Sequence, residues 1–351
     1  IRVIKGDATS IATLKEARIN TSDLFIGVTS SETINITASV LAKQLGAKQT
    51  IARISNSEFI TEQAELGFTK FGIDELISPE FLASSEIQLL LEQYAFNDSY
   101  EFEDGALTML SLKLSRNAAF VGKTVKEAAE VFPELHFVPI AIQRYGTQYT
   151  IIPRGNTPFL EGDKVIFMTS KGGDEELITL SGKSVGDIKN IMILGGGNIG
   201  SKTAKDLCDT KFDVKLIEED RKVAVDLAET LPNVLVINGD GRNSELLEEE
   251  NIREMDAFIA VTKSSETNIM SCLMAKSCGV KKTMALVENM DYFKLSHSIG
   301  IDSLINKKLL AANSIFRYIR KGDVVAMTKL SNMNAELLEF IVHSKSKICN
   351  K

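Results

Sequence analysis

Short apolar runs alternate with amphipathic stretches along the C-terminal half of the chain. Six of these runs predict strands: Ile191–Leu194, Val214–Ile217, Val234–Ile237, Ala257–Val261, Thr283–Val287 and Ser303–Ile305. Between them, apolar residues recur three and four positions apart, which predicts helices at Gly200–Asp209, Lys222–Leu231, Ser244–Glu250, Glu266–Lys276 and Leu309–Arg320. Apolar strands separated by helices are typical of a parallel sheet covered on both faces. We therefore expect a doubly wound α/β domain here.

Residues 99–180 follow a different pattern, in which apolar and polar positions alternate. Four strands are predicted, at Leu107–Leu114, Val138–Arg144, Gln148–Pro153 and Lys164–Met168, with one helix near Val125–Val131. Glycine-containing turns such as Glu161-Gly162-Asp163 separate the strands. This pattern predicts a small α+β domain.

An internal repeat organises the whole chain. Residues 1–53 align without a gap with residues 234–286, and 21 of the 53 pairs are identical. After a length difference within residues 55–71, the offset falls from 233 to 228, so that Gly72-Ile73-Asp74 matches Gly300-Ile301-Asp302. The repeat is far longer than the roughly 20–50 residues of solenoid proteins. The chain is therefore a tandem duplication of an α/β unit.

The alignment predicts the domain organisation. We expect a first Rossmann domain at 1–98, a small α+β domain at 99–180, a linker at 181–188, a second Rossmann domain at 189–322 and the start of a second small domain at 323–351. The second copy opens with a strand and a glycine loop that the first copy lacks here, and it stops before the end of its small domain. We interpret the sequence as a fragment of a longer two-repeat protein, in which the first Rossmann domain is incomplete.

A glycine-rich loop follows the first strand of the second copy. It reads Gly195-Gly196-Gly197-Asn198-Ile199-Gly200 and stands between a strand and a helix. In such a loop the first glycine permits the turn, Gly197 lets the backbone approach a pyrophosphate, and Gly200 lets helix and strand pack closely. The N-terminus of the helix then presents free N–H groups to phosphate. This context predicts a nucleotide site rather than a structural turn.

Polar residues at the carboxyl ends of later strands extend this predicted site. Glu218 ends the second strand, where a carboxylate can accept hydrogen bonds from both ribose hydroxyls and so favours NAD(H), ADP or ATP over NADP. Asp240 and Thr262 follow the third and fourth strands, at the edge where ligands bind in this topology.

The first copy repeats part of this set. Asp7 and Thr29 are the residues equivalent to Asp240 and Thr262, although residues of these types are often only caps. Arg53 ends the fifth strand of the first copy and could reach a phosphate, whereas its equivalent is Leu286. The two sites therefore need not bind the same ligand.

Composition and charge narrow the class of protein. The 351 residues are 44% hydrophobic and 25% charged, which is typical of a globular protein with a sizeable core, and no apolar run reaches 18 residues. The net charge of −7 contains no basic cluster, so we expect no nucleic-acid partner. The four cysteines form no CxxC pair and the three histidines lie far apart, so we expect reduced thiols and no metal site.

Taken together, these motifs resemble the TrkA-type regulatory subunits of bacterial potassium uptake systems, which are built from tandem RCK (KTN) modules. The resemblance rests on the glycine loop with Glu218, on the repeated Gly6-Asp7 and Gly239-Asp240, and on the repeated Val-Thr segments at Val28 and Val261. It rests also on Ile51–Ile54 and on the stretch from Pro153 to Asp163. It implies two Rossmann (RCK N) domains, each followed by a small RCK C domain, the second of them truncated.

The resemblance also implies a function. A protein of this family is expected to be a cytoplasmic, non-enzymatic subunit on the inner face of the membrane. It is expected to form a homo-oligomeric ring, as a dimer or tetramer, and to gate an integral-membrane potassium transporter. Gly195–Gly200, Glu218, Asp240, Thr262 and Lys263 would line the second nucleotide site, and Thr29, Ser30 and Arg53 the surviving part of the first.

Two alternatives remain open. An NAD-dependent oxidoreductase would need a positioned acid or base beside the nicotinamide, and no histidine, lysine or tyrosine stands in a recognisable catalytic spacing. A gating module of a potassium channel or an efflux antiporter would share the same nucleotide chemistry, and only the tandem arrangement separates it from an uptake regulator.

Overall fold

The computed structural model describes most of the chain. The described residues are 2–56, 58–61, 67–92, 98–102, 106–133, 136–145, 147, 149–170, 172–181, 188–210, 212–289, 291–292, 300–319, 324–329, 336–340, 342 and 346. They form two compact units, one of residues 1–84 with 306–321 and the other of residues 85–305 with 322–351. Most of the linker predicted at 181–188 lies outside the described residues.

The first unit contains a parallel sheet of three strands, β1 (Leu24–Gly27), β2 (Gln49–Arg53) and β3 (Glu75–Ile77), in that order. Helices α1 (Ile11–Glu16), α2 (Glu32–Gln44) and α3 (Glu58–Thr61) and the first turns of α5 (Pro79–Glu92) connect or follow them. β3 ends at Ile77, and the helix does not begin there. Pro79 starts the helix instead, because its fixed φ suits the first helical position, where its missing N–H is not needed.

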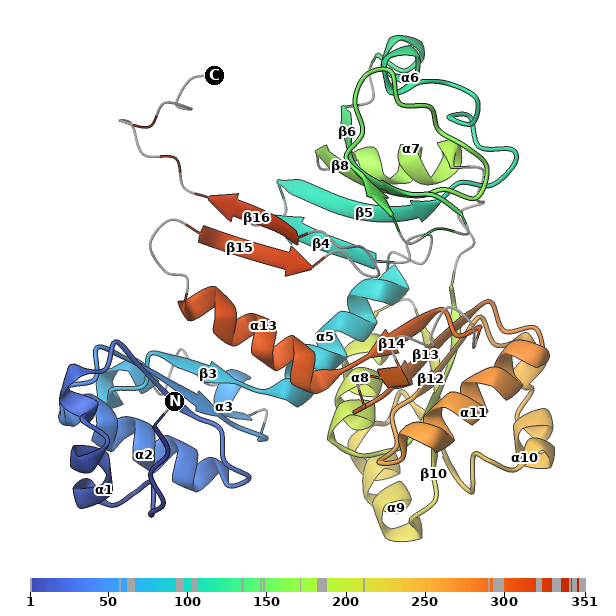
Figure 1. Cartoon of the computed structure of the whole chain (residues 1–351). Coiled ribbons are helices and arrows are strands. Elements are labelled where there is room, and N and C mark those ends of the chain that lie inside the picture. The colour runs from blue at the N-terminus through green and yellow to red at the C-terminus, as the bar shows by residue number, and fades with distance from the viewer. Residues whose placement is uncertain are drawn as a thin grey trace. The chain divides into compact units, whose positions relative to one another are not determined.

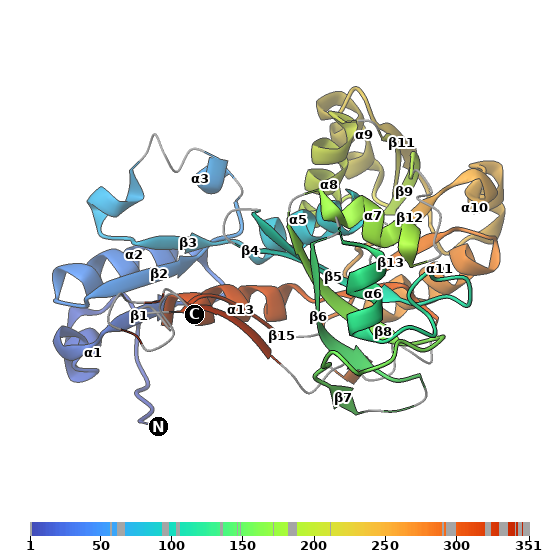
Figure 2. The ribbon, with the colours of Figure 1, turned by 90° about the horizontal axis from the view of Figure 1, so that it is seen from above.

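Both faces of this sheet are covered, and the two covering helices come from different repeats. Side chains alternate along the strands, so Ala52 and Leu76 face α2, whereas Ile51 and Ile77 face the other way. On that second face they pack with Ala311, Ile315 and Tyr318 of helix α13 (Lys307–Ile319). Figure 2 shows α13 alongside the β1–β3 sheet. The structure thus places this helix of the second repeat on the sheet of the first.

The second unit contains a complete Rossmann sheet (Figure 1). Its six parallel strands are β9 (Asn190–Leu194), β10 (Asp213–Glu218), β11 (Leu235–Asn238), β12 (Ala257–Ala260), β13 (Lys282–Leu286) and β14 (Ser303–Ile305). Their order is β11-β10-β9-β12-β13-β14, which is the 3-2-1-4-5-6 order of dinucleotide-binding folds. The predicted doubly wound sheet is thereby confirmed, and its order reverses between β9 and β12.

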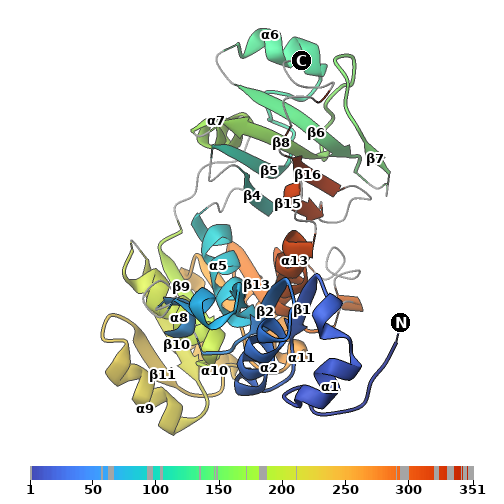
Figure 3. The same cartoon turned by 90° about the vertical axis from the view of Figure 1, so that its left-hand side faces the viewer.

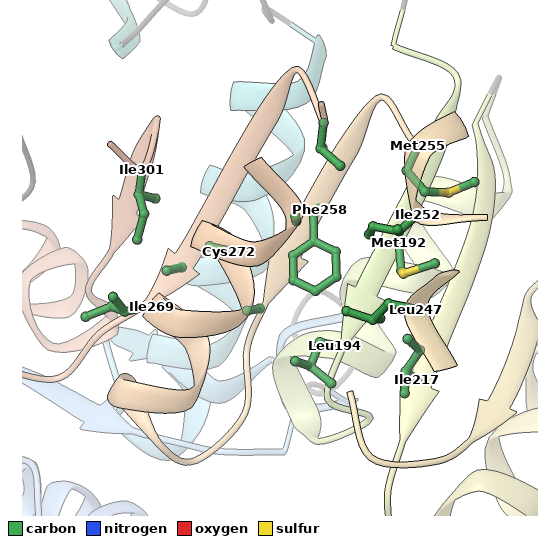
Figure 4. Close-up of a cluster of buried hydrophobic side chains, with 14 of the residues drawn as sticks. Met192, Leu194, Ile217, Leu247, Ile252, Met255, Phe258, Ile269, Cys272 and Ile301 are labelled. Atoms are coloured by element: carbon green, nitrogen blue, oxygen red, sulfur yellow. The ribbon is translucent and has the colours of Figure 1, made fainter. Parts of the chain in front are cut away.

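Among the described residues, the helices between these strands include α8 (Asn198–Cys208), α9 (Arg221–Thr230), α10 (Ser244–Glu249) and α11 (Ser265–Ser277). Figure 4 shows the core between the sheet and the α10 and α11 side, where Phe258 lies among Met192, Leu247 and Cys272. Phe258 and Met192 are both fully buried. This core fixes the strand ends from which the loops of the site extend.

The repeat register found in the sequence holds element by element. β12, β13, α10 and α11 have the bounds of β1, β2, α1 and α2 shifted by 233 residues, and β14 has those of β3 shifted by 228. The three strands of the first unit thus correspond to the second half of the six-stranded sheet.

The small domain is a five-stranded antiparallel sheet of order β4-β5-β8-β6-β7. The strands are β4 (Asp98–Phe102), β5 (Leu107–Lys113), β6 (Phe137–Gln143), β7 (Thr150–Ile151) and β8 (Lys164–Ser170). Figure 3 shows the helices α6 (Val125–Val131) and α7 (Gly173–Leu180) beside this sheet. Their apolar side chains pack on one face of it, around Phe120, Phe159 and Phe167. The sequence pattern missed β4 and α7, whose short apolar segments carry little periodic signal of their own.

The hairpin of β15 (Val324–Lys329) and β16 (Glu336–Phe340) corresponds in the repeat to β4 and β5. Its Leu337 packs against the sheet face opposite the helices, beside Phe102, Met109 and Ile166. Throughout the described residues, no helix combines the length and the apolar character needed to cross a bilayer.

Candidate functional site

The glycine loop between β9 and α8 has little space for a Cβ at three of its glycines. Gly195 has φ +106°, and a Cβ there would lie 3.1 Å from the backbone nitrogen of Thr262. A Cβ on Gly200 would lie 1.9 Å from the carbonyl oxygen of Gly195, and one on Gly196 would lie 2.5 Å from Leu227 Cδ1. The contacts of Gly195 and Gly200 are with backbone atoms, so the fold requires glycine at these two positions, whereas at Gly196 the Leu227 side chain would have to move.

Gly197 is different, because a Cβ built there meets nothing within 4 Å. Its φ of −66° suits any residue, and it is exposed. No steric demand of the fold explains this glycine. A smooth surface at this point suits the approach of a ligand to the backbone.

Helix α8 begins directly after Gly197, which has no side chain to cap it. The N-termini of α1, α2, α9, α10 and α11 are instead capped by Ser10, Ser31, Asp220, Asn243 and Ser264. The first N–H groups of a helix have no partner within the helix and lie at its positive dipole end. The start of α8 thus presents donors suited to an anion.

Glu218 at the end of β10 is hydrogen-bonded to the glycine loop. Its Oε2 accepts a hydrogen bond from the Gly196 N–H at 2.6 Å, and its Oε1 accepts one from the Asp220 N–H at 2.8 Å. A carboxylate offers about four lone-pair sites, so these two bonds leave acceptor capacity for hydroxyl groups. Glu218 is thus partly buried beside the loop and still able to bind a ligand.

The loop after β12 is held by an asparagine that the sequence reasoning missed. Asn268 Oδ1 accepts hydrogen bonds from the Thr262 N–H at 2.9 Å and the Thr262 hydroxyl at 2.7 Å. Its Nδ2 donates to the carbonyls of Thr262 and Leu286. Asn268 is fully buried, and all its donors and acceptors are used, as a buried amide requires. It ties the end of β12 to the end of β13.

The first repeat contains the same arrangement. Asn35 accepts from the Thr29 N–H and hydroxyl, both at 2.7 Å, and donates to the carbonyls of Thr29 and Arg53. The signal was present in the sequence, since Asn35 and Asn268 are identical across the repeat. The Thr29 and Thr262 hydroxyls are engaged within their loops, while Ser30 and Lys263 are exposed beside them.

The acids after the third strand differ between the repeats. Asp240 forms an ion pair with Arg242 at 2.7 Å, and hydrogen bonds from Arg242 hold the pKa of Asp240 below its usual range. Asp7 instead accepts from the Thr9 N–H and hydroxyl, and these hydrogen bonds lower its pKa. Both carboxylates are exposed and ionised at neutral pH.

Arg53, at the carboxyl end of β2, has a buried hydrogen-bond donor that no described residue satisfies. Its Nε is buried and has no hydrogen-bond partner within the part of the chain that the structure describes. A buried guanidinium N–H without an acceptor is rare and calls for an anion or another acceptor. The equivalent residue of the second repeat is Leu286.

The predicted site residues of the second repeat thus gather at the carboxyl edge of one sheet, where the strand order reverses. The side chain of Ile199 is buried, so only the backbone of this predicted site residue can face a ligand. Over the described residues, no group of three histidine, cysteine or acidic side chains could hold a metal ion. The fold and this edge define a protein with tandem Rossmann lobes of the nucleotide-binding class.

Comparison with known families agrees with this class. The TrkA-N domain family matches residues 1–79 and 191–307, and the TrkA-C domain family matches residues 109–182. The Trk system potassium uptake protein TrkA of Haemophilus influenzae is 33% identical over 352 residues, covering 100% of this chain and 76% of that protein. The same-named protein of Vibrio alginolyticus is 32% identical over 358 residues, covering 100% and 77%. The chain belongs to the TrkA family.

Solved structures share the fold. The GsuK channel superimposes with a TM-score of 0.65 at 17% identity, covering 91% of this chain and 55% of that one. The GsuK channel bound to NAD gives 0.64 at 19% identity, covering 91% and 55%. The chain thus spans a little over half the length of these channels, and at such low identity the likeness concerns the fold alone.

Proposed function

We propose that the chain is the nucleotide-sensing regulatory part of a potassium uptake system. One observation carries the proposal: the uncapped start of α8 lies beside an open Gly197 and the carboxylate of Glu218. Those groups match the phosphate and the ribose of a nucleotide, in that order along the edge of the sheet. The family to which the chain belongs supplies the transport context, since its relatives are named potassium uptake proteins.

The second site would take an adenosine nucleotide, namely NAD(H), ADP or ATP. The N–H groups at the start of α8 would hold the phosphates, and the free lone pairs of Glu218 would accept the ribose hydroxyls. A 2′-phosphate would place a second negative charge beside Glu218 and Glu219, so we expect NADP(H) to bind poorly. Asp240, Thr262 and Lys263 would border the same ligand, with Lys263 as the exposed cation.

The first site would use Asp7, Thr29, Ser30 and Arg53. The orphaned Nε of Arg53 supports an anionic ligand there. Leu286 cannot supply such a contact in the second repeat, which supports different ligand preferences at the two sites.

Regulation would follow from a shift between arrangements of the lobes. A nucleotide that binds one arrangement more tightly stabilises it, and a difference of about 1–3 kcal/mol gives useful coupling. The output would be exerted on an integral-membrane potassium transporter by a homo-oligomeric ring of these chains, at the inner face of the membrane. A channel or antiporter partner is the alternative within the same chemistry.

The test is to titrate NAD, NADH, ADP, ATP and NADPH against the intact protein by calorimetry. We expect Gly197→Asp to weaken binding at least about tenfold without loss of stability, because the open space accepts the side chain while its charge repels phosphate. Glu218→Ala should weaken nucleotides that carry a free ribose diol. Tight NADPH binding, or unchanged binding by Gly197→Asp, contradicts the proposed site.

The enzyme alternative makes a separate prediction. A dehydrogenase would oxidise NADH in a manner that depends on a second substrate. We expect binding without turnover in the same preparation. Steady oxidation of NADH that a small substrate stimulates contradicts a purely regulatory role.

A further inference from the structure

Helix α13 lies on the first-repeat sheet through an apolar stripe that both repeats share. Ala311 and Ile315 of α13 pack in the cluster with Ile51 and Ile77. At the offset of 228, these two helix residues correspond to Ala83 and Ile87 of α5, which have the same side chains. The apolar contact by itself therefore does not distinguish the helix of one repeat from that of the other.

Two polar contacts at the edges of this stripe do distinguish them. Lys307 Nζ lies 3.2 Å from Glu80 Oε1, with the side chains 23% and 12% exposed. The Tyr318 hydroxyl donates to Glu75 Oε2 at 2.8 Å. Burial, together with the hydrogen bond to Glu75 and the charge of that carboxylate, raises the pKa of Tyr318, so the phenol stays protonated as a donor.

The repeat alignment shows what these four residues become in the other copy. Lys307 and Tyr318 of α13 correspond to Pro79 and Leu90 of α5. Glu75 and Glu80 of the first repeat correspond to Ser303 and Lys308 of the second. Each acid is thus found only in the first repeat, and each of its partners only in the second.

We infer that these residues determine which repeat pairs with which: the first-repeat lobe accepts the helix of the second repeat and rejects a helix of its own kind. A first-repeat helix on this lobe would set Pro79 and Leu90 against two carboxylates, one of them nearly buried, that then have no donor or cation. A second-repeat helix on a second-repeat lobe would set Lys307 against Lys308. Like charges brought together at an interface oppose association and so select against the wrong pairing.

Glu80 contributes strongly to the preference of the first-repeat lobe for the helix of the second repeat. Its Oε2 is buried and has no hydrogen-bond partner within the described residues, and Lys307 contacts its other oxygen. Replacing that cation with an apolar or like-charged side chain therefore leaves a mostly buried carboxylate uncompensated. This pairing is independent of nucleotide sensing. Two copies of the first repeat, or two copies of the second, could not form the Lys307–Glu80 and Tyr318–Glu75 contacts.

The first experiment is a charge exchange in the full chain, monitored by amide hydrogen exchange of residues 306–319. Glu80→Lys and Lys307→Glu should each speed exchange in α13 about tenfold or more, because each places like charges at a mostly buried contact. The double variant should return to within about threefold of the wild type, since it restores an opposite-charge pair. Singles that leave α13 protected, or a double no better than the singles, overturn the inference.

The second experiment separates specificity from simple stabilisation. Glu75→Ser with Glu80→Lys gives the first lobe the residues of the second, and α13 should lose protection. Adding Lys307→Pro and Tyr318→Leu gives α13 the residues of α5, and protection should recover at least about threefold although four residues are now changed. Proline is tolerated at Lys307 because that residue starts the helix. Equal or lower protection in the fourfold variant overturns the inference.

Discussion

At the carboxyl edge of their sheets, the two repeats share one set of hydrogen bonds but differ in the residue that ends the neighbouring strand. In both, a buried asparagine joins a threonine loop to the end of the neighbouring strand with the same four hydrogen bonds. The strand to which it is joined ends in Arg53 in one repeat and Leu286 in the other. The asparagine, whose polar groups are all satisfied inside the fold, is the same in both repeats, while the residue at the end of the neighbouring strand differs.

The largest expected effect concerns a feature of the second repeat alone. Gly200→Ala should destabilise the second Rossmann lobe by about 3 kcal/mol or more, because its Cβ would lie 1.9 Å from the Gly195 carbonyl oxygen. Hydrogen exchange should show faster opening of β9 and α8, with the β1–β3 sheet less affected. Gly197→Ala is the control and should leave stability within about 0.5 kcal/mol. A stable Gly200→Ala protein contradicts the geometry of the loop.

The shared asparagine provides a matched test in both repeats. Asn268→Ala and Asn35→Ala should each cost about 2–4 kcal/mol, since each leaves several buried backbone groups without a partner. Denaturant unfolding measures the loss, and hydrogen exchange assigns it to the lobe that carries the change. If only one of the two variants is destabilised, the asparagine hydrogen bonds do not contribute equally to the stability of the two repeats.

Replacing Arg53 with leucine, the residue of the second repeat at this position, tests the difference between the two strand ends. Arg53→Leu should weaken an anionic ligand of the first site about tenfold, as expected for the loss of one charged hydrogen bond. Binding at the second site should not change, which calorimetry with two-site fitting can resolve. Arg53→Lys is the control, since it keeps the charge and loses the planar donor set. Equal binding by Arg53→Leu and the wild type contradicts a ligand role for Arg53.

The smallest effect concerns a thiol that replaces a hydroxyl. Cys272 Sγ donates to the Met284 carbonyl at 3.2 Å, where Ser39 Oγ donates to the Ile51 carbonyl at 3.3 Å. Burial raises the pKa of Cys272 from its ordinary 9.0 to about 12. Because the folded pKa is the higher one, the stability linked to this group is present below about pH 9 and is lost as the pH rises toward about 12.

Alkylation at pH 8 should therefore modify Cys272 only when the second lobe opens, and the rate should rise in Gly200→Ala. Cys272→Ser removes the labelling and should change stability by at most about 1 kcal/mol. Fast labelling of Cys272 in the folded wild type contradicts its burial.

Much of the fold could be predicted because its signals are local and occur twice. The strands and helices of the second repeat lie within a few residues of their predicted bounds, and the family suggested by the motifs is confirmed by the comparisons. The glycine loop and Glu218 were predicted as neighbours, and the hydrogen bond from Gly196 to Glu218 joins them. The ligand assignments stay predictions.

What escaped sequence reasoning depended on contacts between distant segments. Asn35 and Asn268 were visible as repeated residues, yet their role needs each asparagine to reach the end of the next strand, 18 residues further along the chain. In the small domain, β4 and α7 are short, and they gain their structure from pairing and burial against β5 and Phe167 rather than from periodicity.

The sequence by itself determined the duplication, the parallel Rossmann sheet and the position of the phosphate-type loop, because apolar periodicity and glycine chemistry act over a few neighbouring residues. Only the tertiary structure decided that α13 of the second repeat covers the sheet of the first and that Lys307 and Tyr318 meet Glu80 and Glu75. An amphipathic helix carries an apolar stripe in its sequence, but which sheet buries that stripe depends on partners more than 200 residues away.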